Sequence, residues 1–213
     1  MSLTFDCTDP VQRERGLGAA MSALRRGELV VVPTDTVYGL GADAFTAPAV
    51  DALLAAKGRG RDLPVPVLVS SKPMVTALAG SLSDAGQRLV DAFWPGPLTI
   101  VVRHTPGLAW DLGDTRGTVA LRMPDHELAL ALISETGPLA ISSANRSGEP
   151  PATTVASACE MLGEDVAVYL DGGPCASNTP STIVDLTADQ PRVLRTGALD
   201  RERLRAVVPD LAP

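Results

Sequence analysis

The chain alternates between short apolar runs and longer segments in which apolar residues recur at helical spacing. The apolar run at 29–32, which Pro33 ends, is typical of a buried strand. Apolar residues three or four positions apart between 17 and 24 indicate a helix, which Gly27 ends. The same rules predict strands at 65–69, 98–102, 118–121, 139–141, 166–170, 182–186 and 192–194, and helices at 46–56, 85–93, after the cap Asp125, at 154–162 and from Asp200.

Strands and helices interleave from one end of the chain to the other, which predicts an α/β fold with a mixed sheet. No internal repeat occurs, and no low-complexity linker divides the 213 residues. We therefore expect a single domain that spans residues 10–205.

The formal net charge is −7, from 18 Lys and Arg against 25 Asp and Glu. This balance gives no general attraction for nucleic acid, so an anion site has to be a local group of cations. Cys7, Cys159 and Cys175 are far apart and form no C-x-x-C pair, so neither a zinc site nor a disulfide framework is indicated. Without a leader-like segment or a long apolar run, the expected protein is soluble and cytoplasmic, with no membrane segment.

Polar and glycine-rich segments follow several of the predicted elements, mainly at the ends of strands, where ligands gather in open α/β sheets. Four of these segments supply a cation, and the others supply hydroxyls, an amide and glycines at 33–41, 142–145 and 181–182. Because Arg side chains match the geometry of phosphate and carboxylate groups, the set predicts one pocket for a polyanionic ligand. The four cations are Lys57, Arg59, Arg122 and Arg195.

The same residues also have structural interpretations, because hydroxyl and amide side chains often cap turns and helices. The two histidines offer no nucleophile–base pair, and His126, directly after Asp125, is expected to be a solvated first-turn residue. The G-x-G-x-x-A pattern at 39–44 is similar to a dinucleotide fingerprint. The strand before it ends at Pro33, however, so we interpret its glycines as a tight loop.

Eight short motifs follow one another along the chain. They are P-T-D-T-V-Y-G-L at 33–40, K-G-R at 57–59, W-P-G-P-L-T at 94–99, V-A-L-R-M-P-D-H at 119–126, S-A-N-R-S-G at 143–148, D-G-G at 171–173, S-T-I-V-D at 181–185 and L-R-T-G at 194–197. Together they resemble the YrdC/TsaC family, and the chain is similar to the short, single-domain form of that family.

The resemblance implies a fold and a reaction. The implied fold is a twisted, mostly parallel sheet of the YrdC-like type that surrounds a deep, positively lined cavity. The implied activity is that of an L-threonylcarbamoyladenylate synthase, a nucleotidyltransferase. It uses L-threonine, bicarbonate or CO2, and ATP with Mg2+, and forms threonylcarbamoyl-AMP and pyrophosphate. This is the first step of threonylcarbamoyladenosine modification of tRNA, and a separate transferase complex then takes the product.

The resemblance also implies roles for individual residues. Lys57 and Arg59 are the implied catalytic cations, and Arg122 is the implied partner of the threonine carboxylate. No dedicated metal ligand is implied, because Mg2+ enters with ATP. The implied ATP-binding residues are Lys57, Arg59, Thr118, Ser143, Asn145, Thr153 and Arg195, and those for L-threonine are Thr34, Thr36, Arg122, Ser142 and Ser181.

The chain departs from the family pattern after K-G-R. Gly60 stands where Pro is common, Leu63 where Asn is common and Leu68 where His is common. Two polar contacts near the substrates are therefore expected to be missing, and Arg61 and Asp62 are candidates to replace them.

Two other functions stay open at this point: an RNA-binding module with the same fold, and a paralogue with another carbamoyl or nucleotide activity. The net charge of −7 does not favour RNA binding, including direct binding of tRNA.

Overall fold

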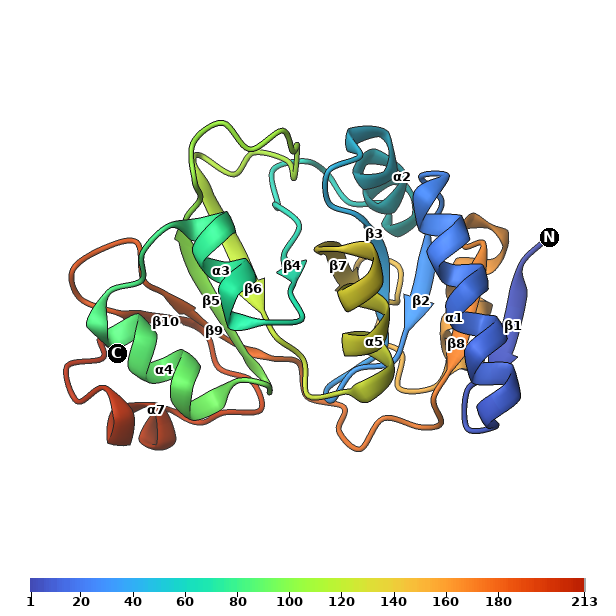
Figure 1. Cartoon of the computed structure of the whole chain (residues 1–213). Coiled ribbons are helices and arrows are strands. Elements are labelled where there is room, and N and C mark those ends of the chain that lie inside the picture. The colour runs from blue at the N-terminus through green and yellow to red at the C-terminus, as the bar shows by residue number, and fades with distance from the viewer. Residues whose placement is uncertain (213) are drawn as a thin grey trace.

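A ten-stranded sheet runs through the whole molecule in the order β1-β8-β2-β3-β7-β4-β6-β5-β9-β10. The computed structural model describes residues 1–212 (Figure 1). All eight apolar runs that the sequence predicts as strands are strands of this sheet. The strands are β1 Leu3–Asp6, β2 Val30–Val32, β3 Gly39–Asp43, β4 Val67–Leu68, β5 Leu98–Arg103, β6 Thr118–Arg122, β7 Leu139–Ser143, β8 Val168–Asp171, β9 Thr182–Asp185 and β10 Arg192–Arg195.

The described part of the chain has seven α-helices, six between strands and one after β10, and six of the seven correspond to predicted helices. Asp9 caps the first, accepting a hydrogen bond from the backbone N–H of Gln12 at 2.8 Å. The expected cap Asp125 is wrong by one residue, because His126 occupies the N-cap position. The helices are α1 Pro10–Arg25, α2 Ala47–Lys57, α3 Lys72–Ala79, α4 Asp84–Phe93, α5 Glu127–Thr136, α6 Val155–Leu162 and α7 Arg201–Val207.

None of the helices within residues 1–212 has both the length and the apolar character that crossing a bilayer requires.

The sheet is mixed, as predicted, but the expectation of mostly parallel pairing is wrong. Five of the nine strand pairs are antiparallel and four are parallel. The main physical reason is β3, which the sequence analysis missed. It runs antiparallel to both of its neighbours, β2 and β7, and so interrupts the parallel pattern.

The glycines of the supposed tight loop lie inside β3, so that interpretation was wrong as well. A Cβ atom on Gly39 would lie only 2.7 Å from the Cδ1 atom of Ile141 on β7. Glycine therefore allows the Ile141 side chain to lie directly over the neighbouring strand. The dinucleotide fingerprint fails for the same reason, since its glycines form a strand that ends four residues before α2 begins.

The sheet separates two apolar clusters and is strongly twisted. In Figure 1, α1 and α5 lie in front of one half of the sheet, and α3 and α4 lie in front of the other half. The two pairs of helices pack against different clusters, and adjacent residues of β4, Val67 and Leu68, each point into a different one. In β6 and β9 buried residues alternate with half-buried ones, so one face of these strands is only partly covered.

Candidate functional site

The four predicted cations come together. Burial, with a contribution from the charge of Arg59, lowers the pKa of Lys57 to about 8. Burial also lowers the pKa of Arg195, with a further contribution from Arg59, and lowers that of Arg122, where the charge of Arg195 adds a small part. Because Lys57 and Arg195 both respond to the charge of Arg59, and Arg122 responds to that of Arg195, the four residues form one cationic group from the end of α2 to the end of β6.

Half of the twelve predicted site residues are buried, which is unusual for charged and hydroxyl side chains. Burial of such groups is costly unless they are hydrogen-bonded, so their partners define the local structure. The six residues are Thr34, Thr36, Lys57, Arg122, Asn145 and Ser181.

Arg122, the last residue of β6, ties two loops to this strand. Its Nη1 donates to the hydroxyl of Thr36 at 2.9 Å, its Nε to the carbonyl of Gly96 at 3.0 Å, and its Nη2 to Oδ1 of Asp35 at 2.5 Å. Thr36 lies 3.0 Å from the hydroxyl of Thr34, which itself donates to the carbonyl of Val37. Because Thr36 accepts from Arg122, it donates to Thr34, and Thr34 donates to Val37. The two hydroxyl protons therefore both point away from Arg122.

Arg195 and Ser181 form a second polar group beside the first. Arg195 donates to the carbonyl of Ser181 from Nε at 3.1 Å and from Nη2 at 2.8 Å, and from Nη2 to its hydroxyl at 3.2 Å. The Ser181 hydroxyl also lies 2.7 Å from that of Thr99. In the sheet, Ile183 pairs with both Thr99 and Arg195, which fixes these residues across three adjacent strands.

Lys57 anchors the turn that follows β7. Its ammonium donates to the carbonyl of Ser143, to the carbonyl of Asn145 at 2.7 Å, and to Oδ1 of Asn145 at 3.4 Å. The amide of Asn145 donates in turn to the carbonyls of Arg146 and Glu149. This explains why the K-G-R and S-A-N motifs occur together, because each completes the other's hydrogen bonds.

Arg59 is held more loosely than the other cations. Its two contacts, to the hydroxyl of Ser142 and to the carbonyl of Pro64, are both 3.4 Å long. Its Nε is buried and has no hydrogen-bond partner among residues 1–212. Because the contacts of its two terminal nitrogens are long, their N–H groups are suited to donate to an anionic ligand.

Two of the predicted residues are not linked to the cationic group by hydrogen bonds. The hydroxyl of Thr118 donates to the carbonyl of Thr115 at 2.8 Å, within its own loop. Thr153 contributes its backbone carbonyl, which accepts from the N–H of Cys175 at 2.8 Å. Their role in binding ATP stays a prediction.

The sequence analysis missed three polar residues that organise this region. Asp35, Tyr38 and Thr99 all lie inside family motifs, but only Thr34 and Thr36 were singled out in the first of these motifs. Thr99 was interpreted as part of the apolar run at 98–102. The hydroxyl of Tyr38 donates to the carbonyl of Gly173 at 2.6 Å and accepts from the N–H of Gly172 at 3.1 Å. The D-G-G motif thus fixes the threonine-rich loop.

His126 and Arg61 are placed differently from the expectation. His126 is half-buried, burial lowers its pKa, and its Nδ1 is buried without a partner among the described residues, so it is no solvated first-turn residue. Arg61 forms ion pairs with Asp51 and Asp111 at the surface, so its charge is already paired, and its role as a replacement for a substrate contact stays a prediction. Of the two leucines that stand where the family commonly has a polar residue, Leu63 is exposed, whereas Leu68 is in the core.

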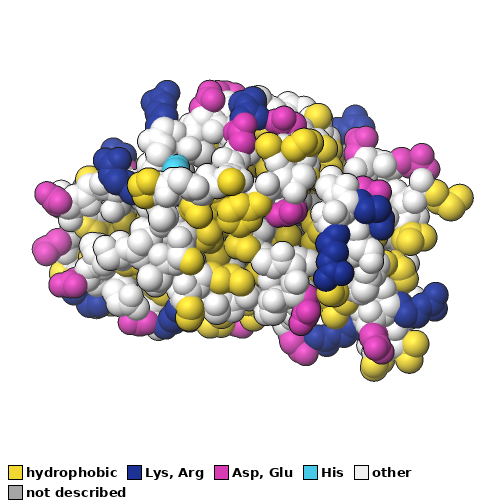
Figure 2. Space-filling model, turned by 45° about the horizontal axis from the view of Figure 1, so that its top comes forward, with side chains coloured by type: hydrophobic (Ala, Val, Ile, Leu, Met, Phe, Trp, Pro, Cys, Tyr) yellow, Lys and Arg dark blue, Asp and Glu magenta, His cyan; other side chains and the backbone are white. Residues whose placement is uncertain are grey.

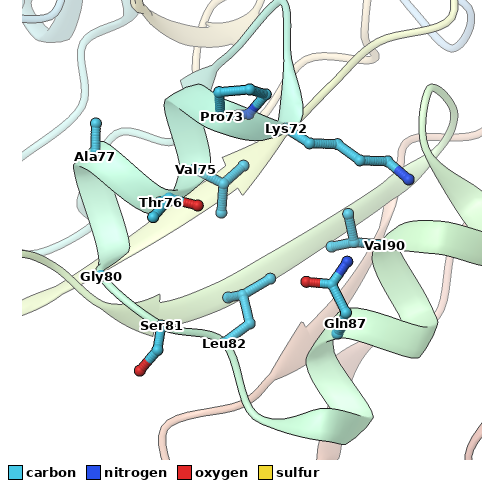
Figure 3. A pocket seen from close by; sticks show the side chains of 10 residues that line it. All are labelled: Lys72, Pro73, Val75, Thr76, Ala77, Gly80, Ser81, Leu82, Gln87 and Val90. Carbon is cyan, nitrogen blue, oxygen red and sulfur yellow. The ribbon is translucent and has the colours of Figure 1, made fainter.

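A hollow of about 830 Å³ lies outside this group of residues, between α3 and α4 (Figure 3). The side chain of Lys72 extends along it toward α4, where its ammonium pairs with Asp91 at 2.5 Å. None of the twelve predicted site residues lines it. The deep, positively lined cavity therefore stays a prediction.

We expect Gly197→Ala to displace the loop that carries Ser181. A Cβ atom at Gly197 would lie 2.2 Å from the carbonyl oxygen of Pro180 and 2.6 Å from the carbonyl carbon of Ser181, both in the backbone. Overpacking against backbone should lower the free energy of unfolding by about 1–3 kcal/mol, measured in urea. Gly18→Ala in α1 is the matched control, because nothing lies within 4 Å of its Cβ position. Equal stability of the two variants would contradict the predicted overpacking at Gly197.

A mixed sheet that brings several hydroxyls and four cations together, without a nucleophile–base pair, is suited to bind anionic substrates. The chain belongs to the Sua5/YciO/YrdC family, since the family described as "Telomere recombination" matches residues 22–197.

Relatives match nearly the whole chain. A putative threonylcarbamoyl-AMP synthase of Mycobacterium tuberculosis is 55% identical over 98% of this chain and 96% of its own length. A threonylcarbamoyl-AMP synthase of Bacillus subtilis is 39% identical over 95% of this chain but only 60% of its own length. The structure of P. abyssi Sua5 complexed with L-threonine has a TM-score of 0.89 and 34% identity, and covers 100% of this chain and 63% of that one.

Proposed function

We propose that this protein is an L-threonylcarbamoyladenylate synthase. L-threonine and bicarbonate or CO2 form a carbamate, whose oxygen attacks the α-phosphate of ATP and releases pyrophosphate, so the enzyme is a nucleotidyltransferase. The observation that carries the proposal is the 55% identity, over 98% of the chain, to a protein named as a putative synthase of this kind. The chemistry needs positioning and charge neutralisation rather than a protein nucleophile, which suits the residues present.

The ATP side of the site is assigned to the three cations without an acidic partner. Lys57, Arg59 and Arg195 form no ion pair within residues 1–212. Their charges repel one another, and a triphosphate relieves that repulsion. Lys57 and Arg59 are the proposed catalytic cations. The other proposed ATP-binding residues are Ser143 and Asn145, with Thr118 and Thr153 at the edge of the group.

The threonine side is assigned to Arg122 and the hydroxyls around it. An Arg side chain has five N–H donors, and Arg122 uses one each on Nε, Nη1 and Nη2 for protein acceptors. One N–H is left on each terminal nitrogen, which is what a carboxylate needs for bidentate binding. Thr34, Thr36, Ser142 and Ser181 supply the hydroxyl groups around the substrate.

The remaining parts of the proposal concern partners. Mg2+ enters as the complex with ATP and shares the charge of its phosphates. The product passes to a threonylcarbamoyl transferase complex in the cytoplasm. Direct tRNA binding is not favoured, since Lys and Arg are scattered among Asp and Glu on the face shown in Figure 2 and form no stripe there.

The test is pyrophosphate release from ATP and bicarbonate with and without L-threonine. We expect release that depends on both L-threonine and bicarbonate. A folded protein that binds ATP but shows no dependence on L-threonine would overturn the proposal and favour a paralogue with another carbamoyl or nucleotide activity. Salt-dependent RNA binding without turnover would instead support the RNA-binding module.

A further inference from the structure

Asp35 lies between the two threonines of the substrate loop and holds Arg122. Its Oδ1 accepts from Nη2 of Arg122 at 2.5 Å and from the backbone N–H of Asp125 at 3.0 Å. The side chains of this ion pair are only 9% and 15% exposed for Arg122 and Asp35 respectively. One carboxylate oxygen is therefore fully used in joining the threonine-rich loop to the β6–α5 loop.

The other oxygen of Asp35 is free. Oδ2 takes part in no hydrogen bond within residues 1–212, and it does not belong to the buried atoms that lack a partner. It therefore faces space that solvent, or a ligand, can reach. Being half of a carboxylate, it is the strongest type of acceptor that a protein offers to a positively charged donor.

The Arg122–Asp35 pair is complementary in charge to a free amino acid. The pair is neutral overall, with two free N–H groups on Arg122 and one free anionic oxygen on Asp35 beside them. An α-amino acid is a zwitterion whose ammonium nitrogen and carboxylate carbon are about 2.5 Å apart, across a single Cα. Its two charges therefore fit two adjacent, oppositely charged groups. The triphosphate is matched separately, by Lys57, Arg59 and Arg195.

We propose that Oδ2 of Asp35 accepts a hydrogen bond from the ammonium group of L-threonine, while Oδ1 keeps Arg122 oriented toward the substrate carboxylate. Asp35 is then a substrate-binding residue that recognises the amino group. The inference rests on the proposed function, because it concerns the same threonine site.

The sharpest test is Asp35→Asn. Asparagine keeps one oxygen that accepts from Arg122 and from the N–H of Asp125, but it replaces Oδ2 by an amide nitrogen, which only donates. Binding is measured by calorimetry for L-threonine and for 2,3-dihydroxybutanoate of matching stereochemistry, which keeps the carboxylate and the side-chain hydroxyl but has a hydroxyl in place of the amino group. Asp125→Asn is the matched control, because it removes an exposed charge from the same junction.

We expect Asp35→Asn to weaken L-threonine binding about 10- to 100-fold, the effect of losing one hydrogen bond to a charged group, and to leave binding of the amine-free probe nearly unchanged. Asp125→Asn should change neither. Equal losses for both probes would overturn the proposal and leave Asp35 as a positioning residue for Arg122 alone, and no loss for either probe would overturn it too. Wild-type protein that neither binds L-threonine nor releases pyrophosphate in its presence would instead refute the proposed function itself.

Discussion

Arg122→Ala should abolish nearly all threonine-dependent pyrophosphate release, lowering kcat/KM for L-threonine about 100- to 1000-fold. The guanidinium is buried and joins Thr36, Asp35 and Gly96, so its removal does more than delete one contact. It also leaves the carboxylate of Asp35 without its counter-ion in a site where that side chain is 15% exposed. Steady-state kinetics with varied L-threonine at saturating ATP measures the loss.

Two further variants show whether the loss is specific. Arg122→Lys keeps the charge but offers a single ammonium in place of a planar fork, so an intermediate loss is expected. Arg26→Ala is the control, because Arg26 pairs with Glu28 at the surface, away from the site, and should leave activity unchanged. Threonine-dependent release that survives in a folded Arg122→Ala protein would remove Arg122 from the threonine site.

The predicted strands were found because buried strands of this sheet are short apolar runs. The strand β3 was missed because its sequence, Gly39–Asp43, lacks the β-branched residues that mark a strand. Its place in the sheet depends on the side chain of Ile141, about a hundred positions later in the chain, which the glycines accommodate. The balance of parallel and antiparallel pairs followed from that one strand, so it could not be predicted from local patterns.

Candidate site residues could be selected from the sequence, but their contacts could not. Polar side chains next to apolar runs, and the order of the motifs, were sufficient to select Lys57 and Arg122. Their roles in the fold depend on distant partners, such as the carbonyls of Ser143 and Asn145 for Lys57. Thr99, in contrast, could not be selected as a candidate from the sequence. It looks like one residue of an apolar strand, and only the pairing of β5 with β9 brings it to Ser181.

Lys57→Met should destabilise the protein by about 2–4 kcal/mol, because three oxygen acceptors lose their donor at once. Lys57 is only 3% exposed, and its ammonium donates to two backbone carbonyls and to the side chain of Asn145. Methionine has a similar length and is apolar, so the change tests the hydrogen bonds rather than the packing. The free energy of unfolding is measured in urea at neutral pH.

Lys72→Met is the matched control, because Lys72 is the chain's other lysine and pairs with Asp91 at the surface. A surface ion pair of this kind contributes less than about 1 kcal/mol. If the two variants lost equal stability, the three contacts of Lys57 would not be holding the turn after β7.

The difference in unfolding free energy between wild type and Lys57→Met should also depend on pH. This dependence tests whether burial or hydrogen bonding dominates the pKa of Lys57. Burial and the charge of Arg59 lower its pKa from 10.5 to about 8, whereas three oxygen acceptors act to retain the proton. With the lower folded pKa, the unfolded chain binds more protons between pH 8 and 10.5, so the stability due to Lys57 rises with pH in that window. The gap between wild type and Lys57→Met should therefore widen over this range. A gap that narrows would mean that the acceptors outweigh burial and that the folded pKa lies above 10.5.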